Sequence, residues 1–438
     1  MQSGLEVKVW EATALPPDWF KRQTPDEKAR EQLESDVKAI INQVIKNGDA
    51  ALTELTEKFD KTRLTAKNLR VKPAEIKEAC QAVSEEQISA LKFIKDKVSA
   101  FEKLLLKQAG FKTSRAGITV QNVLRPIESV GCYVPGGQAA YPSTLVMTAV
   151  PAKVAGVLRI VVCSPPNAKG AINPLVLVAA DICGVNEIYK VGGAQAIAAL
   201  AYGTETIKPV RKIVGPGNKY VTTAKILVSK DVAIDMPAGP SEVLVLADET
   251  ASPRVVALDM ISQAEHGADS VAGLITTSEK LAEEVQVWLA KTATGAERGE
   301  IVGKALEKYG FIITCKDMNK AVELANVFAP EHVEIMTKAP MEIADRITSA
   351  GLILVGPYSP VALSDYGSGT NHVLPTGGFG HAFSGLSALD FTRRVSIVES
   401  SKDGLLSLRN YVKVMTAAEN LPNHYKAIEA RFESERRM

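Results

Sequence analysis

The stretch from residue 187 to residue 218, EIYKVGGAQAIAALAYGTETIKPVRKIVGPGN, decides the fold class. It holds two short runs rich in β-branched residues, and each run leads into a glycine-bearing turn. An alanine-rich segment of helical length lies between the two runs. This alternation of strand, glycine turn and helix is typical of parallel βαβ units. It therefore predicts α/β architecture.

The same rhythm extends in both directions along the chain. It begins at about Ser129 and includes the run RIVVC at residues 159–163. After the turn PAGP at residues 237–240 it resumes, with further strand-like runs at residues 242–246, 271–276, 311–314 and 352–355. The pattern predicts two Rossmann-like domains, each built on a parallel sheet.

Helical patterns flank the two predicted sheets. On the N-terminal side, residues 24–27 read as a capped helix start, Asn47-Gly48 as a helix stop followed by Asp49 as the next cap, and residues 84–87 as a second capping box. On the other side, the chain is glycine-rich and loop-like from about Tyr358 and reads as helical from about Gly404. We expect four parts, namely an N-terminal helical arm (1–106), a first α/β domain (107–238), a second α/β domain (239–380) and a C-terminal helical tail (381–438).

Bulk composition narrows the class of protein. The chain has 438 residues, more than the roughly 250–300 at which a single hydrophobic core stops growing. A formal net charge of +1 gives no field that would gather polyanions, so nucleic acid is not an expected partner. The sequence has neither an apolar run approaching the roughly 18 residues that span a bilayer nor the pattern of a signal peptide at its start. We therefore expect a cytoplasmic protein with no membrane partner.

The positions of the cysteines and histidines limit where a metal site or a proton-transfer site can lie. Five cysteines, at positions 80, 132, 163, 183 and 315, form no CxxC pair, so we expect reduced and mostly buried thiols. The five histidines, at positions 266, 332, 372, 381 and 424, all lie in the last 40% of the chain. A metal or proton-transfer site that uses imidazole must be built there.

Three glycine-bearing turns in the first α/β region suggest a nucleotide site. They are GCYVPGG at 131–137, GGAQ at 192–195 and GPGN at 215–218. Turns of this kind line the carboxyl edge of a parallel sheet, where backbone amides and helix N-termini favour phosphate. None completes GxGxxG, because Tyr220 stands where the third glycine would be. Plain strand-to-helix connections remain the alternative.

Four side chains could form a metal site. Gln263 and His266 are three residues apart, which would place them on one helix face near its C-terminus. An amide oxygen with an imidazole nitrogen makes a mixed ligand set suited to zinc. Asp365 and His424 could complete four-coordination. A histidine beside a glutamate on a solvated helix face is the competing interpretation.

A carboxylate lies next to an imidazole in the sequence APEHVEI. Glu331 and His332 follow a proline turn, and His372 lies in the segment SDYGSGTNHVLP that also holds Asp365. The dipeptide could be ordinary surface polarity, but its association with other rare histidines favours acid–base work.

These blocks, taken together, resemble the histidinol dehydrogenase family over about residues 24–430. The blocks that carry the resemblance are GCYVPGG, VGGAQAIAALAYGTE, GPGNKYV, IDMPAGPSEVLV, SQAEHG, APEHVEI and GTNHVLPTGG with its sequel FSGLS. A single GG or EH has no value as a signal. Seven blocks in family order and near family spacing are highly specific.

The resemblance implies cofactors and a set of site residues. It implies NAD bound by Tyr133, Gln195 and Asn218, and Glu331 and His332 as the catalytic pair. It also implies zinc held by Gln263, His266, Asp365 and His424, the last from the other subunit of a homodimer. The implied substrate contacts are Ser241, Gln263, His266, His332, Asp365, His372, Glu419 and His424.

The implied activity is the oxidation of L-histidinol to L-histidine through histidinaldehyde with two NAD, the final step of histidine biosynthesis. Two alternatives are a related zinc and NAD dehydrogenase of another small polar alcohol, and a structural protein that binds a nucleotide or metal without turnover. The sequence departs from the family pattern in AENLPNHYKA, at residues 418–427, and at His381. Glu419 and His424 are nevertheless retained.

Overall fold

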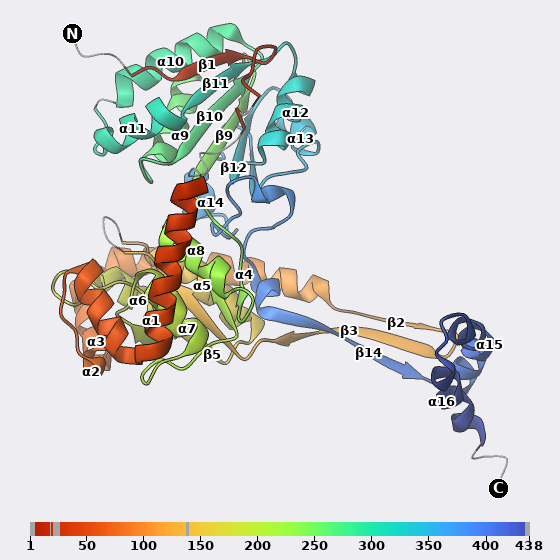
Figure 1. Ribbon diagram of the computed structural model, residues 1–438. Helices are drawn as coiled ribbons and strands as arrows, with labels where there is room; N and C mark the ends of the chain where they lie inside the picture. The colour runs from red at the N-terminus through yellow and green to blue at the C-terminus, as the bar shows by residue number, and fades with distance from the viewer. Residues whose placement is uncertain (1–4, 18, 21–26, 137–139, 294, 434–438) are drawn as a thin grey trace. The chain divides into compact units, whose positions relative to one another are not determined.

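The computed structural model describes residues 5–17, 19–20, 27–136, 140–293 and 295–433. Residues 24–26 of the expected first helix start and Gly137 of the first glycine-bearing turn lie outside this range. The chain divides into two units, and the elements within each are shown in Figure 1. Unit 1 comprises Met1–Glu102 and Ile127–Phe391, and unit 2 comprises Lys103–Pro126 and Thr392–Met438.

The first parallel sheet lies in unit 1 and has five strands in the order β6-β5-β4-β7-β8. Its strands are β4 (Ser129–Tyr133), β5 (Arg159–Cys163), β6 (Glu187–Tyr189), β7 (Lys212–Val214) and β8 (Ala233–Ile234). The helices that alternate with them are α5 (Pro142–Ala155), α6 (Pro174–Ile182), α7 (Gly193–Tyr202) and α8 (Lys219–Val228). The chain starts in the middle and adds strands first on one side and then on the other, so the strand order reverses between β4 and β7.

The second parallel sheet, also in unit 1, repeats this order and adds one edge strand. The order is β1-β11-β10-β9-β12-β13. The strands are β1 (Lys8–Glu11), β9 (Glu242–Ala247), β10 (Val271–Thr276), β11 (Phe311–Thr314), β12 (His332–Met336) and β13 (Leu352–Val355), with helices α9 (Pro253–Ala264), α10 (Glu279–Ala293), α11 (Gly299–Tyr309), α12 (Met318–Phe328), α13 (Pro340–Ala344) and α14 (Val361–Tyr366). The prediction of two Rossmann-like parallel sheets is confirmed.

The N-terminal segment is mostly helical, as expected, with one exception. It contains α1 (Glu27–Asp60), α2 (Ala66–Leu69), α3 (Pro73–Ala82) and α4 (Glu85–Ala109). The exception is β1, which pairs with β11 in the second sheet. The expectation of helix throughout residues 1–106 is therefore wrong at residues 8–11.

Two of the predicted helix signals can be checked directly. The capping box is confirmed, because Gln87 N–H donates to Ser84 Oγ and Ser84 N–H donates to Gln87 Oε1, each at 3.2 Å. The stop at Gly48 is confirmed by its non-helical φ of 51° inside α1. Asp49 does not cap the helix that follows, because its carboxylate accepts hydrogen bonds from the backbone and hydroxyl of Thr206.

Unit 2 is a three-stranded antiparallel sheet followed by two helices. The strand order is β14-β3-β2, with β2 (Phe111–Arg115), β3 (Ile118–Pro126) and β14 (Thr392–Ser400). The helices are α15 (Lys402–Ala418) and α16 (Pro422–Glu433). Strand β14 falls in a segment that we expected to be loop-like, and β2 and β3 fall in the segment assigned to the first α/β domain. Because β2 is exposed along its length and β14 along all but its first residue, the sequence lacks the alternating apolar face that marks a half-buried strand.

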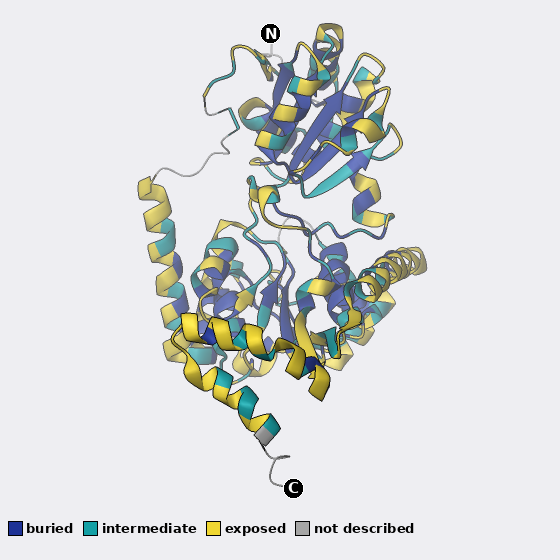
Figure 2. Ribbon diagram, turned by 90° about the vertical axis from the view of Figure 1, so that its right-hand side faces the viewer, coloured by how far each residue is buried: buried dark blue, intermediate teal, exposed yellow. Residues whose placement is uncertain are grey.

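The strands of both parallel sheets form the buried core of unit 1, as Figure 2 shows. Every residue of β4, β9, β10 and β12 is buried, which explains their continuous rather than alternating apolar pattern. All five cysteines are free, and four of them are buried, as predicted. Within the described residues, no helix combines the length and the apolar character needed to cross a bilayer.

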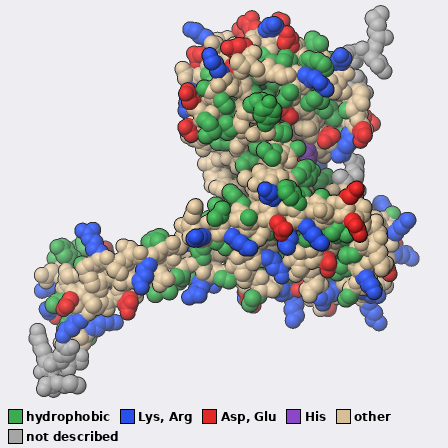
Figure 3. All heavy atoms as spheres, turned by 180° about the vertical axis from the view of Figure 1, so that it is seen from behind, with side chains coloured by type: hydrophobic (Ala, Val, Ile, Leu, Met, Phe, Trp, Pro, Cys, Tyr) green, Lys and Arg blue, Asp and Glu red, His purple; other side chains and the backbone are tan. Residues whose placement is uncertain are grey.

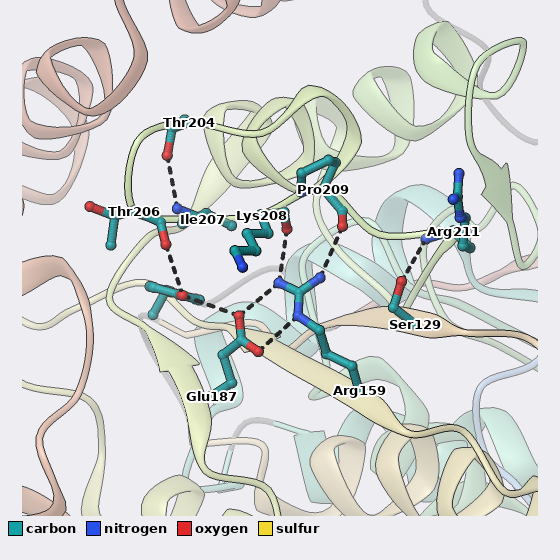
Figure 4. A network of polar contacts seen from close by, with 10 residues as sticks. Ser129, Arg159, Glu187, Thr204, Thr206, Ile207, Lys208, Pro209 and Arg211 are labelled. Carbon is teal, nitrogen blue, oxygen red and sulfur yellow. Dashed lines mark hydrogen bonds and ion pairs between the residues drawn. The ribbon is translucent and has the colours of Figure 1, made fainter.

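Charged side chains form a structural hydrogen-bond network at the amino edge of the first sheet. Arg159 forms a bidentate pair with Glu187, at 2.7 and 2.9 Å, and donates to the carbonyls of Lys208 and Pro209 (Figure 4). This network ties β5 and β6 to the loop that precedes β7. Elsewhere on the molecule both signs of charge occur on the face shown in Figure 3, in keeping with the net charge of +1.

Candidate active site

The glycine-bearing turns of the first sheet are in direct contact at its carboxyl edge. The Tyr133 hydroxyl, at the end of β4, accepts a hydrogen bond from the Gly193 backbone N–H at 3.1 Å. Gly215, at the end of β7, has a φ of 115°, and a Cβ there would lie 2.2 Å from the Tyr133 carbonyl oxygen. Only glycine fits this position. The three turns therefore form one packed edge, as predicted.

A buried ion pair holds the last of these turns. Lys225 Nζ donates to the Gly215 carbonyl at 2.9 Å, and the Gly215 N–H donates to Asp235 Oδ2 at 2.8 Å. Lys225 and Asp235 are also paired with each other, and their side chains are only 3% and 1% exposed. Both polar groups of the glycine are thus fixed by charged side chains.

The predicted cofactor residues occupy different settings at this edge. Tyr133 and Gln195 are buried, with 3% and 1% exposed surface, and burial raises the pKa of the Tyr133 phenol. Asn218 is exposed and caps α8, where its side-chain oxygen accepts from the backbone N–H groups of Tyr220 and Val221 at 3.0 and 3.2 Å. Contact of these side chains with NAD remains a prediction.

The residues expected to do acid–base work lie at the amino edge of the second sheet. Glu331 and His332 stand at the start of β12, directly beside the start of β9, and His332 is paired with Val243. Glu331 Oε2 accepts a hydrogen bond from the Glu242 backbone N–H at 2.8 Å. His332 Nδ1 lies 3.1 Å from the Glu242 carbonyl oxygen. Both side chains are buried, so the interpretation of this dipeptide as surface polarity is wrong.

The contact with the Glu242 carbonyl fixes the state of the His332 ring. A carbonyl can only accept, so Nδ1 carries the proton and Nε2 keeps its lone pair. Nε2 is buried and has no hydrogen-bond partner among the described residues. Burial, with a smaller contribution from nearby His266, lowers the pKa of His332 to about 4. The ring is therefore neutral near pH 7, and its Nε2 is unprotonated.

Glu331 is a carboxyl group that resists ionisation. Burial raises its pKa well above the usual value, and the neighbouring charges of Glu242 and Asp365 act in the same direction, against the hydrogen bond from Glu242 N–H. Its Oε2 lies 3.6 Å from His332 Nδ1. A carboxylate with a raised pKa is a stronger base when it does ionise.

Glu334 connects the two helices that carry the predicted metal ligands. Glu334 Oε1 accepts the Val361 N–H at 2.7 Å, at the start of α14, and the Glu334 side chain also hydrogen-bonds Asp259 of α9. Burial raises the pKa of Asp259 to about 6, so the two acids can share a proton. Gln263 and Asp365 each lie four residues, or one helical turn, beyond these contacts. Strand β12 thus joins the helices that carry the predicted metal ligands to the predicted catalytic pair.

The two predicted ligands of SQAEHG are neighbours, although not on one helix face. Helix α9 ends at Ala264, so the expectation that it continues through His266 is wrong. His266 lies just beyond the end, and its N–H donates to the Gln263 carbonyl at 3.3 Å. Gln263 is 1% exposed, and its Oε1 is buried with no hydrogen-bond partner among the described residues. Such an oxygen is available for a ligand.

His372 joins the same cluster from the loop after α14. Its Nδ1 lies 3.8 Å from Asp365 Oδ1, and its Nε2 lies 3.5 Å from Thr144 Oγ1 of α5. Burial lowers the pKa of His372 to about 4, with smaller contributions from His332 and His266. Burial also raises the pKa of Asp365 to about 7. Three of the five histidines are therefore close enough to influence one another's protonation.

The remaining predicted residues are placed as follows. Ser241 is half-buried at the start of β9, and its carbonyl accepts the Val271 N–H at 3.0 Å. Glu419 and His424 belong to unit 2. Within the part of the chain that the structure describes, no three His, Cys, Asp or Glu side chains are grouped to hold a metal. Unit 1 offers Gln263, His266 and Asp365, of which only two are of those types, so the whole zinc ligand set stays a prediction.

Comparison with known proteins shows the family of this chain. The family model described as histidinol dehydrogenase matches residues 23–432. The chain belongs to the histidinol dehydrogenase family. It is 47% identical over 392 residues to the histidinol dehydrogenase of Methanothermobacter thermautotrophicus, covering 90% of this chain and 92% of that one. It is 43% identical over 428 residues to the histidinol dehydrogenase of Clostridium acetobutylicum, covering 97% and 99%.

A solved structure of the histidinol dehydrogenase family has the same fold. The crystal structure of histidinol dehydrogenase from Elizabethkingia anophelis superposes with a TM-score of 0.93 at 37% identity, covering 98% of this chain and 99% of that one. The matched range includes every predicted site residue, and membership makes the chain an oxidoreductase. Sequence reasoning missed Glu242, Asp259 and Glu334. Their carboxyl groups contact the segments that carry the candidate site residues. Acidic residues within apolar runs, as in SEVLV and HVEIM, were the available signal.

Proposed function

We propose that this chain oxidises L-histidinol to L-histidine through histidinaldehyde, with two NAD, as the final step of histidine biosynthesis in the cytoplasm. The single observation that carries this proposal is the His332 ring at the amino edge of the second sheet. Its Nε2 is buried, unprotonated near pH 7 and without a hydrogen-bond partner among the described residues, next to the buried carboxyl group of Glu331. Membership of the family supplies the substrate.

The side chains at the end of α9 are suited to a cation. Gln263, His266 and Asp365, with His424 from a second copy of the chain, would hold zinc, which would anchor the imidazole and amine of histidinol. The buried and unpartnered Gln263 Oε1 supports this donor set. The carboxyl end of a helix carries partial negative charge, which further favours a cation beside His266.

The packed edge of the first sheet is suited to a dinucleotide. Tyr133, Gln195 and Asn218 would contact NAD, which accepts the hydride. Helix α7 begins at Gly193, within one glycine-bearing turn, and helix α8 begins at Lys219, directly after another. Their N-terminal amides favour a pyrophosphate.

In the first oxidation His332 acts as the base. Its Nε2 takes the proton of the substrate hydroxyl while the carbon bearing that hydroxyl loses hydride, and the product is the aldehyde. Because Nδ1–H already donates to the Glu242 carbonyl, the same contact stabilises the imidazolium that forms. A base of this kind typically contributes about 10²–10⁴-fold in rate.

In the second oxidation Glu331 acts first. Its carboxylate takes a proton from water as the water oxygen adds to the aldehyde carbon. The His332 imidazolium formed in the first oxidation returns its proton to the aldehyde oxygen, giving the hydrate and restoring neutral His332. His332 then takes a hydroxyl proton of the hydrate while the carbon loses a second hydride, and the acid forms. Ser241, His372 and Glu419 would contact the substrate, and the burial of the catalytic pair keeps bulk water away from the aldehyde.

Unit 2 supports the proposed homodimer. Its helix α15 exposes large apolar side chains, with Tyr411 and Val414 being 74% and 67% exposed in the single chain. Contiguous exposed apolar side chains of this kind mark interaction surfaces. A second copy of the chain covering them would bring His424 and Glu419 with it.

The test is a count of reduced cofactor. Purified protein is mixed with limiting histidinol and excess NAD, and the NADH formed is measured against the substrate consumed. We expect about two NADH per histidinol. A count near one would restrict the chain to alcohol oxidation, and no turnover of histidinol would reject the proposed substrate.

A further inference from the structure

We propose that the Glu242 side chain is a positioning residue for this reaction, because it fastens the loop that carries His372 to the start of β12 and sets the charge that faces Glu331. This inference rests on the function proposed above and adds to it a residue that acts through others. Glu242 is 1% exposed, at the first position of β9.

The carboxylate of Glu242 receives two backbone N–H groups from different segments. Its Oε2 accepts from Glu331 N–H at 3.3 Å, at the start of β12. Its Oε1 accepts from Gly377 N–H at 3.1 Å, in the loop that follows His372. One side chain thus holds the catalytic glutamate and the substrate loop at once. We call this pair of contacts the Glu242 bridge.

A neighbouring contact joins the same two regions. The Gly239 N–H, three residues before Glu242, donates to the hydroxyl of Thr376, the residue before Gly377. The segment PAGPSE, which contains Ser241, is therefore fastened twice to the segment NHVLPTGG, which contains His372. Two fastenings between these segments fix the spacing of the predicted substrate contacts relative to Glu331 and His332.

The side chain of Glu242 can be tested separately from its backbone. The backbone N–H and C=O of Glu242 contact Glu331 and His332, and a substitution leaves both groups in place. A variant at residue 242 therefore removes the bridge without removing the contact that sets the His332 tautomer.

The charge of Glu242 affects the pKa of Glu331, and a purely structural role of Glu242 would not. The pH profile of the reaction can therefore distinguish the two roles. The titratable groups around Glu331 are Glu242 on β9, His332 on β12 and Asp365 on α14. The negative charge of Glu242 is one of the causes that raise the pKa of Glu331, after burial. Removing that charge should lower the pKa of Glu331, so its carboxylate form should persist to lower pH.

The experiment compares Glu242→Gln, which removes the charge at constant size, with Glu242→Asp, which keeps the charge and shortens the reach. Full-length protein is assayed for the conversion of histidinaldehyde to histidine as a function of pH. Glu102→Gln is the matched control, because Glu102 is also a buried carboxyl group that accepts a backbone N–H, from Ala388.

We expect both Glu242 variants to lower kcat/KM for histidinaldehyde by about 10- to 100-fold, the loss that follows from a broken hydrogen bond to a charged group. The acidic limb of the pH profile should move to lower pH in Glu242→Gln and stay in place in Glu242→Asp. Glu102→Gln should leave that limb unmoved. If the limb stays in place in Glu242→Gln, or moves equally in all three variants, the assigned role of Glu242 is wrong.

A measurement without substrate keeps this inference separate from the proposed function. Amide hydrogen exchange of residues 371–378 should be faster in Glu242→Gln and also in Thr376→Val, which removes only the neighbouring fastening. Unchanged exchange in Glu242→Gln would refute the bridge even if histidinol is the substrate. Wild-type protein that fails to oxidise histidinol would refute the proposed function, while the exchange data would still decide on the bridge.

Discussion

The two parallel sheets have the same strand order but place their functional groups at opposite ends. In the first sheet the glycine turns meet at the carboxyl edge, where Tyr133 contacts Gly193 and Gly215. In the second sheet Glu331 and His332 lie at the amino edge, beside the start of β9. Both positions fall where the strand order reverses, between β4 and β7 in one sheet and between β9 and β12 in the other.

The difference shows what each edge of a parallel sheet can offer. At the carboxyl edge, helices begin, and their backbone amides suit an anion such as pyrophosphate. At the amino edge, helices end, and their partial negative charge and terminal side chains suit a cation. The first edge is built from backbone groups that only glycine can bring together. The second is built from buried polar side chains, and Gln263 Oε1 and His332 Nε2 are among the buried atoms there that have no hydrogen-bond partner in the described part of the chain.

The largest expected effect comes from Glu331→Gln at the second edge. The amide cannot take a proton from water, so histidine formation from the aldehyde should fall by about 10²–10⁴-fold, while aldehyde formation stays within a few-fold of wild type. Separate assays with histidinol and with histidinaldehyde measure the two half-reactions. Equal loss in both would show that Glu331 does not act in the hydration step.

His266→Asn tests whether the same edge holds the metal. Losing a ligand should remove zinc and lower activity by at least about 100-fold, because even the partners of metal ligands are worth about 10- to 100-fold. Zinc per chain is measured by elemental analysis together with turnover. Full activity in protein freed of metal would reject a zinc role.

Lys225→Met weakens the first edge alone. Breaking a buried pair costs about 3–5 kcal/mol of stability, and the Gly215 turn loses one of its two charged contacts. We expect KM for NAD to rise about tenfold, with KM for histidinol nearly unchanged. Arg159→Met is the matched control, because it breaks a half-buried pair at the opposite edge of the same sheet (Figure 4). A similar rise in KM for NAD in that control would mean that general loss of stability, and not the turn, is responsible.

The smallest expected effect is a pH dependence of stability at the second edge. The pKa of His332 is about 4 in the folded protein, against about 6.5 in an unfolded chain. Between these values the unfolded chain binds a proton that the folded chain does not, so the free energy of unfolding falls as pH drops from about 6.5 to 4. The contribution is at most about 3 kcal/mol. Denaturant unfolding of metal-free wild type and His332→Gln should differ in slope over this window, and parallel curves would contradict the burial of a neutral ring.

The sequence predicted strands best at short, continuous apolar runs. The runs at 159–163, 212–214 and 271–276 coincide with β5, β7 and β10, because burial on both faces makes such runs continuous. Strand β12 was not predicted, since His332 and Glu334 make HVEIM look exposed. Those polar side chains are buried, and their contacts with Glu242, Asp259 and Val361 are long-range in sequence.

The sequence predicted which residues form the candidate site, but it did not predict that they lie at the amino edge of the second sheet. Rare residue types and family blocks pointed to Gln263, His266, Asp365 and His372, and the structure brings Asp365 and His372 within 3.8 Å. The location at the amino edge was not predicted, although Ser241 precedes one strand and Glu331 precedes another. The end of α9 before His266 also escaped prediction, because the residues around it have no strong helix stop other than Gly267.

The central claim is that the donors converge on one ion at the amino edge of the second sheet. Anomalous X-ray scattering at the absorption edge of zinc tests it most directly. Crystals of the zinc-loaded protein should show one peak per chain in contact with Gln263, His266 and Asp365, completed by His424 of a second copy. A peak bound by other side chains, or zinc-loaded and active protein with no peak among these residues, would contradict the account.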